Sequence, residues 1–303
     1  MPITKYKIIK WAKMIFGKSL LHVPQKEGKI YSFDKIMGYY NDLTEKVLRD
    51  KSNYHLTSVI TAPNNEGRPF HFPIAIFQYG LGAYDLYLMD IDKTLMKEKF
   101  LSAANWACSN QNYNGSWTTF HLDYPKNPFS SMAQGEGASL LLRAFKLTGE
   151  ANYLLAARKA LEFMLLPLEE GGTTDYTEEG VFFYEFTCFP LVYNGWVFSI
   201  FGLLDYVIET NDKAFEMILD QSLKTFVNKM QKMDNGYWSM YRDDRTIASP
   251  FYHNLHMSLL KVLYEYTSDS RYLDLINKFK KYSKNPICKT RAILKKAFQK
   301  LIS

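Results

Sequence analysis

Hydrophobic residues recur at helical spacing along most of the chain, in pairs of segments joined by short polar turns. In the first pair, residues 73–88 lead through Asp90-Ile91-Asp92 into residues 95–110. Three further pairs comprise residues 131–147 with 152–165, 195–208 with a segment that runs on to 233, and 253–266 with a segment that ends near 281. This spacing predicts amphipathic helices, and each polar turn predicts an antiparallel helix hairpin.

A short loop motif supports the idea of a repeat. Asn-Gly-x-Trp follows the second helix of the first pair at 114–117 and the second helix of the third pair at 235–238. Repeated αα-hairpins of this length stack into a solenoid or close into a toroid. We therefore expect an all-α dominated fold, an (α/α) toroid or incomplete barrel of helical hairpins with short β-hairpin loops.

Composition narrows the class of protein. The chain has 303 residues, of which 47% are hydrophobic, so it can bury a substantial core and is not disordered. No apolar run is long enough to cross a bilayer, and lysines interrupt any apolar region that a signal peptide would need. Three distant cysteines without a CxxC motif argue against a disulfide framework and fit a reducing compartment. We expect a cytoplasmic protein.

Positive charge is concentrated at the two ends. Residues 1–22 hold five lysines and no acid, and residues 278–303 hold nine Lys/Arg and no acid. Removing these 14 charges from the formal net charge of +6 leaves −8 for residues 23–277. An acidic body predicts no nucleic-acid partner, and an anionic ligand would have to be bound by a few local cations.

Each basic end also has an apolar helical face. The two faces comprise Ile8, Trp11 and Ile15 at one end and Ile287, Leu294, Phe298 and Leu301 at the other. Short basic amphipathic helices can lie on an anionic membrane, here its inner face, and the alternative is a solubilising tail.

Chemistry-bearing residues gather around one predicted helix start. Residues 237–245 read YWSMYRDDR and residues 252–256 read YHNLH, which combines phenols, arginines and imidazoles. Other helix starts, at Ser131 and Asn194, are also polar. In a toroid these starts would meet at one rim, where free N–H groups favour a carboxylate. His253 and His256 are three residues apart, but no third ligand or HExxH motif is evident, so we expect no metal.

Five short motifs occur in the order found in D-glucuronyl C5-epimerases, which convert glucuronate to iduronate in heparosan or heparan-type chains. They begin at Gln78, Ser131, Tyr184, Asn194 and Tyr252, and they read QYGLGAY, SMAQGE, YEF, NG and YHNLH. The chain thus resembles the C-terminal catalytic domain of that family. The resemblance implies a toroid fold, no cofactor and an acidic, glucuronate-containing polysaccharide as partner, and it leaves a homodimer open.

On this resemblance the chain divides into three parts. Residues 1–69 form a basic amphipathic segment and lead-in, residues 70–283 the (α/α) toroid catalytic domain, and residues 284–303 a basic amphipathic tail.

Epimerisation at C5 needs a base on one face, a proton donor on the other and positive charge for the carboxylate. The resemblance matches the family's glutamate to Glu185, its two tyrosines to Tyr241 and Tyr252, and its arginine to Arg245 or, less closely, Arg242. We expect Tyr252 and Glu185 as opposed acid/base groups, with Tyr241 assisting and an arginine neutralising the carboxylate. The remaining expected substrate contacts are His253, His256, Gln134, Tyr184 and Asn194.

One departure and several alternatives stay open. The family commonly has Glu-Glu-Tyr-Pro where this chain has Tyr184-Glu185-Phe186-Thr187, so a phenol is missing that Tyr184 can replace. The tyrosines can also be core residues, and Glu185 can pair with a surface arginine. At the level of function, the alternatives are a uronan lyase or glycoside hydrolase of the toroid type, and a non-catalytic protein that binds acidic glycans.

Overall fold

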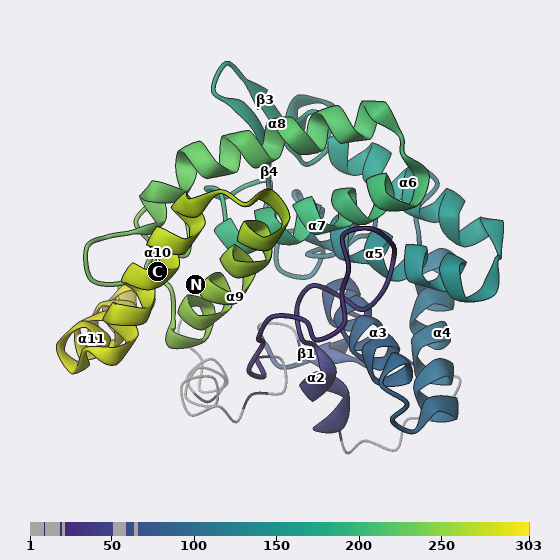
Figure 1. Ribbon diagram of the computed structural model, residues 1–303, viewed down its shortest axis with the longest axis horizontal. Coiled ribbons are helices and arrows are strands. Elements are labelled where there is room, and N and C mark those ends of the chain that lie inside the picture. The colour runs from purple at the N-terminus through teal and green to yellow at the C-terminus, as the bar shows by residue number, and fades with distance from the viewer. Residues whose placement is uncertain (1–8, 10–18, 20–21, 51–58, 64–65, 303) are drawn as a thin grey trace.

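The computed structural model describes residues 9, 19, 22–50, 59–63 and 66–302. Four helix hairpins follow one another along the chain and stand side by side in an arc (Figure 1). The hairpins are α3 (Pro73–Leu88) with α4 (Lys93–Ser109), α5 (Ser131–Thr148) with α6 (Ala151–Leu165), α7 (Tyr193–Thr210) with α8 (Lys213–Lys229), and α9 (Pro250–Thr267) with α10 (Ser270–Lys284). The expectation of an all-α dominated fold is confirmed.

The sequence marks the ends of these helices. Ser130, Asp212 and Ser249 each accept a hydrogen bond from a backbone N–H in the first turn of α5, α8 and α9, which satisfies a donor that has no partner within the helix. At the other end, α5 stops at Gly149 with a φ of 77°, the left-handed conformation that glycine adopts without strain. Gly149 and Asp212 thus mark the turns of two hairpins, and Ser130 and Ser249 mark where the first helices of two hairpins begin.

The arc has an inner and an outer layer of helices. The inner helices α3, α5 and α7 are buried over almost their whole length, whereas outer helices such as α8 bury one face only. Helices α5 and α7 pack closely because glycines face each other at their contact. A Cβ on Gly202 would lie 2.3 Å from the carbonyl oxygen of Gly135, so only glycine fits there.

The remaining elements are short or lie near the ends of the described chain. They are α2 (Thr44–Leu48), η1 (Leu168–Glu170), η2 (Met230–Met233), α11 (Pro286–Ile302), and four strands, β1 (Ala62–Pro63), β2 (Pro69–Phe70), β3 (Thr174–Thr177) and β4 (Gly180–Phe183). Strands β1 and β2 pair antiparallel, as do β3 and β4, in which Thr174 lies opposite Phe183. Along the chain, β1 and β2 lie between α2 and α3, and β3 and β4 lie between α6 and α7.

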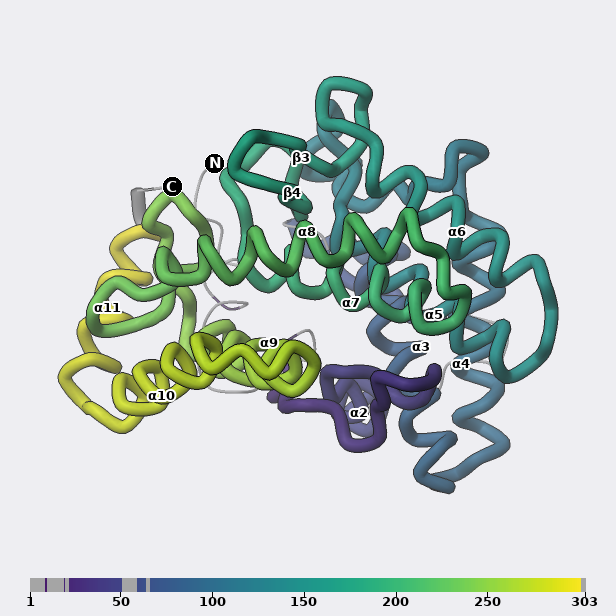
Figure 2. Tube along the Cα trace, turned by 45° about the horizontal axis from the view of Figure 1, so that its top comes forward, coloured from purple at the N-terminus to yellow at the C-terminus, as the bar shows by residue number. Residues whose placement is uncertain are grey.

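Residues 22–50 fill the open side of the arc, between α9 and α3 (Figure 2). In this segment the Tyr39 N–H donates to Asp85 of α3 at 2.9 Å, and the Tyr40 hydroxyl donates to Asp205 of α7 at 2.9 Å. Arg143 of α5 donates to the Gly38 carbonyl at 3.0 Å and forms a buried ion pair with Asp205 at 2.6 Å. The segment therefore binds the C-terminal halves of three inner helices and leaves their N-terminal ends to form the site.

The described residues contain no helix with both the length and the hydrophobicity needed to span a membrane.

Candidate active site

A cavity of about 370 Å³ lies at the N-terminal ends of the first helices of the four hairpins, α3, α5, α7 and α9. Ile74 of α3, Met132 of α5, Asn194 of α7 and Tyr252 of α9 all line it. Helix N-termini carry partial positive charge, and their first N–H groups lack partners within the helix. This end of the arc therefore favours an anionic ligand.

The three residues expected to be catalytic all line this cavity, although they come from distant parts of the chain. Glu185 follows β4, Tyr241 lies in the loop that precedes α9, and Tyr252 is in the first turn of α9. The rings of Tyr241 and Tyr252 lie 4.6 Å apart between centroids at an angle of 47°, and their hydroxyls share a hydrogen bond. The fold thus places a carboxyl group and two phenols around one volume.

Glu185 is held against the first turn of α7. A Cβ on Gly195 would come within 2.5 Å of its Oε2, which explains the glycine after Asn194. The Glu185 side chain is buried, and its Oε2 has no hydrogen-bond partner among the described residues. Burial raises the pKa of Glu185 to about 8. This carboxyl therefore gains and loses a proton near neutral pH.

Both tyrosines are protonated at neutral pH. Burial raises the pKa of Tyr241 and of Tyr252, and the nearby charge of Glu185 raises both further. Their mutual hydrogen bond raises the pKa of Tyr241 and lowers that of Tyr252, as expected where the Tyr241 hydroxyl donates and the Tyr252 oxygen accepts. Tyr252 is therefore the phenol whose anion is better stabilised by its neighbour.

Aromatic side chains form another wall of the cavity. The rings of Phe120 and Phe186 are stacked at 4.2 Å between centroids, and Tyr124 lies edge-on to Phe186. Phe186, at the position where the family commonly has tyrosine, thus adds an apolar face to the cavity. Such faces suit the C–H side of a sugar ring.

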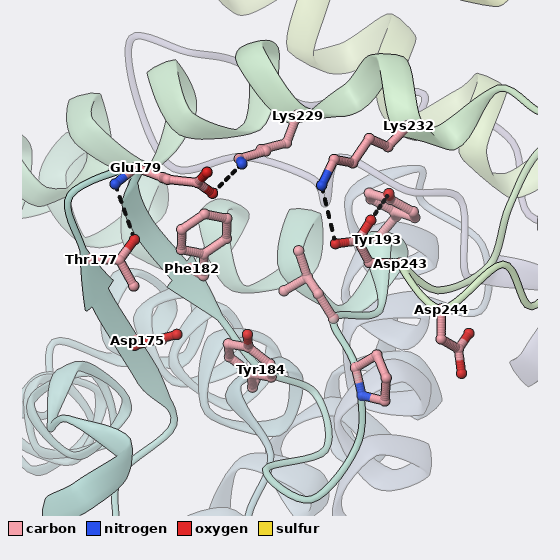
Figure 3. A pocket seen from close by; sticks show the side chains of 12 residues that line it. Asp175, Thr177, Glu179, Phe182, Tyr184, Tyr193, Lys229, Lys232, Asp243 and Asp244 are labelled. Atoms are coloured by element: carbon pink, nitrogen blue, oxygen red, sulfur yellow. Dashed lines mark hydrogen bonds and ion pairs between the residues drawn. The ribbon is translucent and has the colours of Figure 1, made fainter.

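Of the expected substrate contacts, Asn194 lines the cavity and Tyr184 does not. The Asn194 Oδ1 is buried and has no partner among the described residues. Tyr184 lines a second pocket of about 410 Å³, between the β3–β4 hairpin and the end of α8 (Figure 3). Both lysines of this pocket are paired: Lys229 with Glu179, and Lys232 with Asp243 at 3.7 Å.

Gln134 is fully buried and does not reach the cavity lining. Its Oε1 accepts the Trp117 N–H at 3.1 Å, and its Nε2 donates to the carbonyls of Gly115 and Ala160 at 3.0 and 2.9 Å. Because the protein itself uses both ends of the amide, Gln134 anchors the Asn-Gly-x-Trp loop, and this geometry offers nothing for the expected sugar contact.

The two histidines lie behind the cavity lining. His253 is buried against Trp238 at 3.7 Å between ring centroids; the Ser239 N–H donates to its Nδ1, and its Nε2 lies 3.1 Å from the Phe279 carbonyl. The Nδ1 of His256 lies 3.1 Å from the Ser239 hydroxyl, and its Nε2 has no partner among the described residues. Burial lowers the pKa of His253 to about 4 and that of His256 to about 3, so both are neutral.

Within the described part of the chain, no three His, Cys, Asp or Glu side chains are grouped closely enough to hold a metal ion.

Neither of the two expected arginines lines the cavity. Tyr241 N–H donates to the Thr246 carbonyl, so residues 242–245 form a tight surface turn in which Arg245 has a φ of 65°. Arg242 pairs with Asp244 at 2.8 Å and lies over the ring of Phe189. Both arginines line a separate surface pocket beside α11.

Two lysines that the sequence did not single out do line the cavity, Lys46 of α2 and Lys300 of α11. Lys46 lies near a buried acid: Gln78 donates to Glu136 at 2.8 Å, burial raises the pKa of Glu136 to about 8, and the charge of Lys46 lowers it. Gln78 and Glu136 belong to the motifs at 78–84 and 131–136, so the sequence already pointed to the segments that carry them. Lys46 had none, because a lysine in a short helix is usually a solvated surface residue.

Comparison with known proteins shows what the sequence of this chain is similar to. The model of the family described as D-glucuronyl C5-epimerase C-terminus matches residues 103–281. A D-glucuronyl C5-epimerase of Caenorhabditis elegans is 31% identical over 148 residues, which are 46% of this chain and 23% of the nematode protein. An uncharacterized protein of Methanocaldococcus jannaschii is 24% identical over 174 residues, which are 55% of this chain and 56% of the archaeal protein. The matched regions thus span about a quarter and about half of these two relatives.

Proposed function

The chain belongs to the family of the D-glucuronyl C5-epimerase C-terminus, and from this premise we propose that it is a polysaccharide epimerase. In this proposal it inverts C5 of D-glucuronate to give L-iduronate within a heparosan-like polymer. The single observation that supports it most is the meeting of Glu185, Tyr241 and Tyr252 at one cavity.

The proposed reaction moves one proton off C5 and one proton onto it. When a base removes the C5 hydrogen, the electron pair of the C–H bond spreads into the adjacent carboxylate. A donor on the opposite face of the ring then protonates C5 with inverted configuration. We assign these two roles to Glu185 and Tyr252, with Tyr241 assisting through its hydrogen bond to Tyr252. No other bond in the polymer changes.

The protonation states support these roles. With a pKa raised to about 8, Glu185 is a stronger base when ionised than an exposed glutamate and a usable acid when protonated. The two phenols are neutral before substrate binds, so a proton is available on their side of the cavity. The helix N-termini favour the negative charge that develops on the uronate.

The experiment that tests the proposal is NMR of glucuronate polymers, heparosan first, incubated with the protein in D₂O. We expect deuterium at C5 and new iduronate signals without chain cleavage. Tyr252→Phe and Glu185→Gln should each lower the exchange rate by about 10²–10⁴-fold, because each removes a proton-transfer group. Tyr113→Phe is the matched control, since Tyr113 is 98% exposed.

Other outcomes would point to the alternative functions. An unsaturated sugar that absorbs in the ultraviolet would indicate a lyase, in which the C4 substituent leaves instead of C5 regaining a proton. Cleavage without unsaturation would indicate a hydrolase. Polymer binding without exchange would indicate a non-catalytic glycan-binding protein. The motivation for this alternative is Phe186, which stands where the family commonly has a tyrosine.

We also propose contact with an anionic membrane, as the basic ends suggested, at the inner face in a cytoplasmic location. Three residues of the C-terminal face are exposed on α11: Ile287 at 78%, Leu294 at 65% and Phe298 at 56%. The corresponding N-terminal face, Ile8, Trp11 and Ile15, lies outside the described residues. Co-sedimentation with anionic vesicles that weakens as salt rises would support this contact. Failure to sediment at low salt would contradict it.

A further inference from the structure

Helix α11 packs its inner face against the loop that carries Tyr241. The Ile247 N–H donates to the Gln299 Oε1 at 3.0 Å, and the Gln299 Nε2 donates to the Arg245 carbonyl at 3.0 Å. Lys296 Nζ donates to the Ile247 carbonyl at 2.7 Å. Ala292, one helical turn earlier, is buried in a small cluster with Trp238 and Ile247. Side chains of α11 thus satisfy the backbone of the turn that follows Tyr241.

Lys296 also lies beside the Tyr241 ring itself. Its Nζ is 5.4 Å from the ring centroid, within range of a cation–π contact, and the side chain is 7% exposed. Burial and the nearby charges of Lys300 and Arg242 lower the pKa of Lys296 to about 7, while Asp244 raises it. The other charged or titratable groups that face Tyr241 are Glu185, Tyr252 and Arg242. A positive charge at Lys296 favours the ionised form of the phenol pair.

Lys300, one turn after Lys296, lies at the exposed edge of the cavity. The two arginines expected to bind the uronate carboxylate lie outside the cavity lining. Of the lysine and arginine side chains in the described part of the chain, those that line the cavity are Lys46 and Lys300. Both lie outside residues 103–281, the region that the family model matches. Positive charge therefore reaches this cavity from segments that flank the matched region.

We propose that α11 is a part of the active site, in which Lys296 and Gln299 are positioning residues for Tyr241 and Lys300 binds the anionic polymer at the edge of the cavity. The inference rests on the proposed function, since the polymer is its substrate. It differs from a simple tail, because a solvated tail would leave the Tyr241 loop and the cavity unaffected.

The test compares three neighbouring lysines of one helix. Lys295 lines the outer surface pockets and not the cavity, so Lys295→Ala is the matched control with the same change of charge. We expect Lys300→Ala to raise KM for heparosan about three- to five-fold and to leave kcat nearly unchanged, as for loss of an exposed ionic contact. Lys296→Met should lower kcat about ten-fold and leave KM nearly unchanged.

The pH profile separates the charge of Lys296 from the loop contact of Gln299. Lys296→Met should remove the limb of kcat near pH 7 that reports Lys296, whose pKa lies at about 7, because the methionine side chain does not titrate. Gln299→Ala should lower kcat without moving that limb. The inference is overturned if the wild-type protein is active and both Lys296→Met and Lys300→Ala show the same kinetics and pH profiles as wild type.

Two measurements that need no catalytic turnover test the role of α11 separately from the proposed function. Backbone amide deuterium exchange at residues 239–249 should rise in Lys296→Met and Gln299→Ala and not in Lys295→Ala. Calorimetric binding of heparosan should weaken in Lys300→Ala and not in Lys295→Ala. If wild-type protein binds the polymer but shows no C5 exchange, the epimerase proposal fails while these two measurements still decide the role of α11. If they match wild type, α11 has no such role.

Discussion

At the scale of single residues, burial disfavours the charged forms of two acids, Glu185 in the cavity lining and Glu136 outside it. Glu185 and Glu136 both have a pKa raised to about 8, and each has a carboxylate oxygen without a partner among the described residues. An isolated buried carboxylate is costly, so these groups hold protons that exposed glutamates release. Such groups often mark functional sites, and here the family and the cavity point to the same place.

This burial predicts a pH-dependent difference in stability for Glu185→Gln. The folded-state pKa of Glu185 lies above the unfolded value, so the folded state binds the proton more tightly and wild type loses stability as pH rises from about 4.5 to about 8. The amide cannot ionise and avoids this loss. Thermal unfolding should therefore show similar Tm values for both proteins below pH 4.5 and a higher Tm for the variant at pH 9. A Tm difference independent of pH would contradict the assignment.

The meeting of Glu185, Tyr241 and Tyr252 at one cavity could be predicted from the order of the motifs, because the resemblance matched these three residues to the family's glutamate and tyrosines. The position of the two arginines outside the cavity lining could not be predicted. The backbone reverses between Tyr241 and Thr246, and Arg242 and Arg245 in this turn lie outside the cavity lining; a run of charged residues does not reveal such a turn. For Gln134, the motif identified an important residue, but its hydrogen bonds to distant backbone give it a structural role.

At the scale of elements, the contact between α5 and α7 supports the whole site, because these helices carry Met132 and Asn194 to the cavity. Their close approach depends on glycines whose neighbours are backbone atoms. Hydrophobic periodicity located these helices well: the expected segments 131–147 and 195–208 correspond to Ser131–Thr148 and Tyr193–Thr210. Periodicity carries no information on which faces meet.

Gly202→Ala should destabilise the fold by about 1–3 kcal/mol, because the new Cβ meets the backbone of Gly135, which cannot rotate away. Gly80→Ala is the matched control in α3. Its Cβ would meet the end of the Leu140 side chain, which can rotate, and the Ala103 Cβ, which moves only with its backbone, so we expect a smaller loss than for contact with two backbone segments; alanine also favours the helix. Urea denaturation of both variants measures the difference. An equal or larger loss in Gly80→Ala would contradict the proposed backbone contact.

At the scale of the whole molecule, residues 22–50 join helices that are far apart in sequence. The segment meets α3, α5 and α7 through a buried network centred on Arg143 and Asp205, which are each 1% exposed. The sequence could not predict this arrangement, since residues 22–50 have no repeat and their partners lie up to 234 positions away. The docking of α11 was missed for the same reason.

Breaking the buried pair should be strongly destabilising. Asp205→Ala leaves the Arg143 guanidinium buried without its carboxylate, and we expect a loss of about 3–5 kcal/mol. The double variant Arg143→Met/Asp205→Leu should lose less, because neither buried group is then charged. Glu162→Ala, which removes an exposed pair with Arg158, should leave the free energy of unfolding unchanged. Guanidinium denaturation measures the free energy of unfolding of all three variants. An equal loss in Asp205→Ala and Glu162→Ala would contradict the expected cost of breaking the buried pair.

The attachment of α11 has a consequence for heating. Its buried cluster consists of Trp238, Ile247, Ala248 and Ala292, separate from the main core of the hairpins, and one face of the helix remains open to solvent. A unit with so little apolar burial opens at a lower free energy than the rest of the molecule. Warming should therefore release this helix before the hairpins melt, so catalytic turnover should vanish several degrees below the temperature at which the far-ultraviolet dichroism collapses.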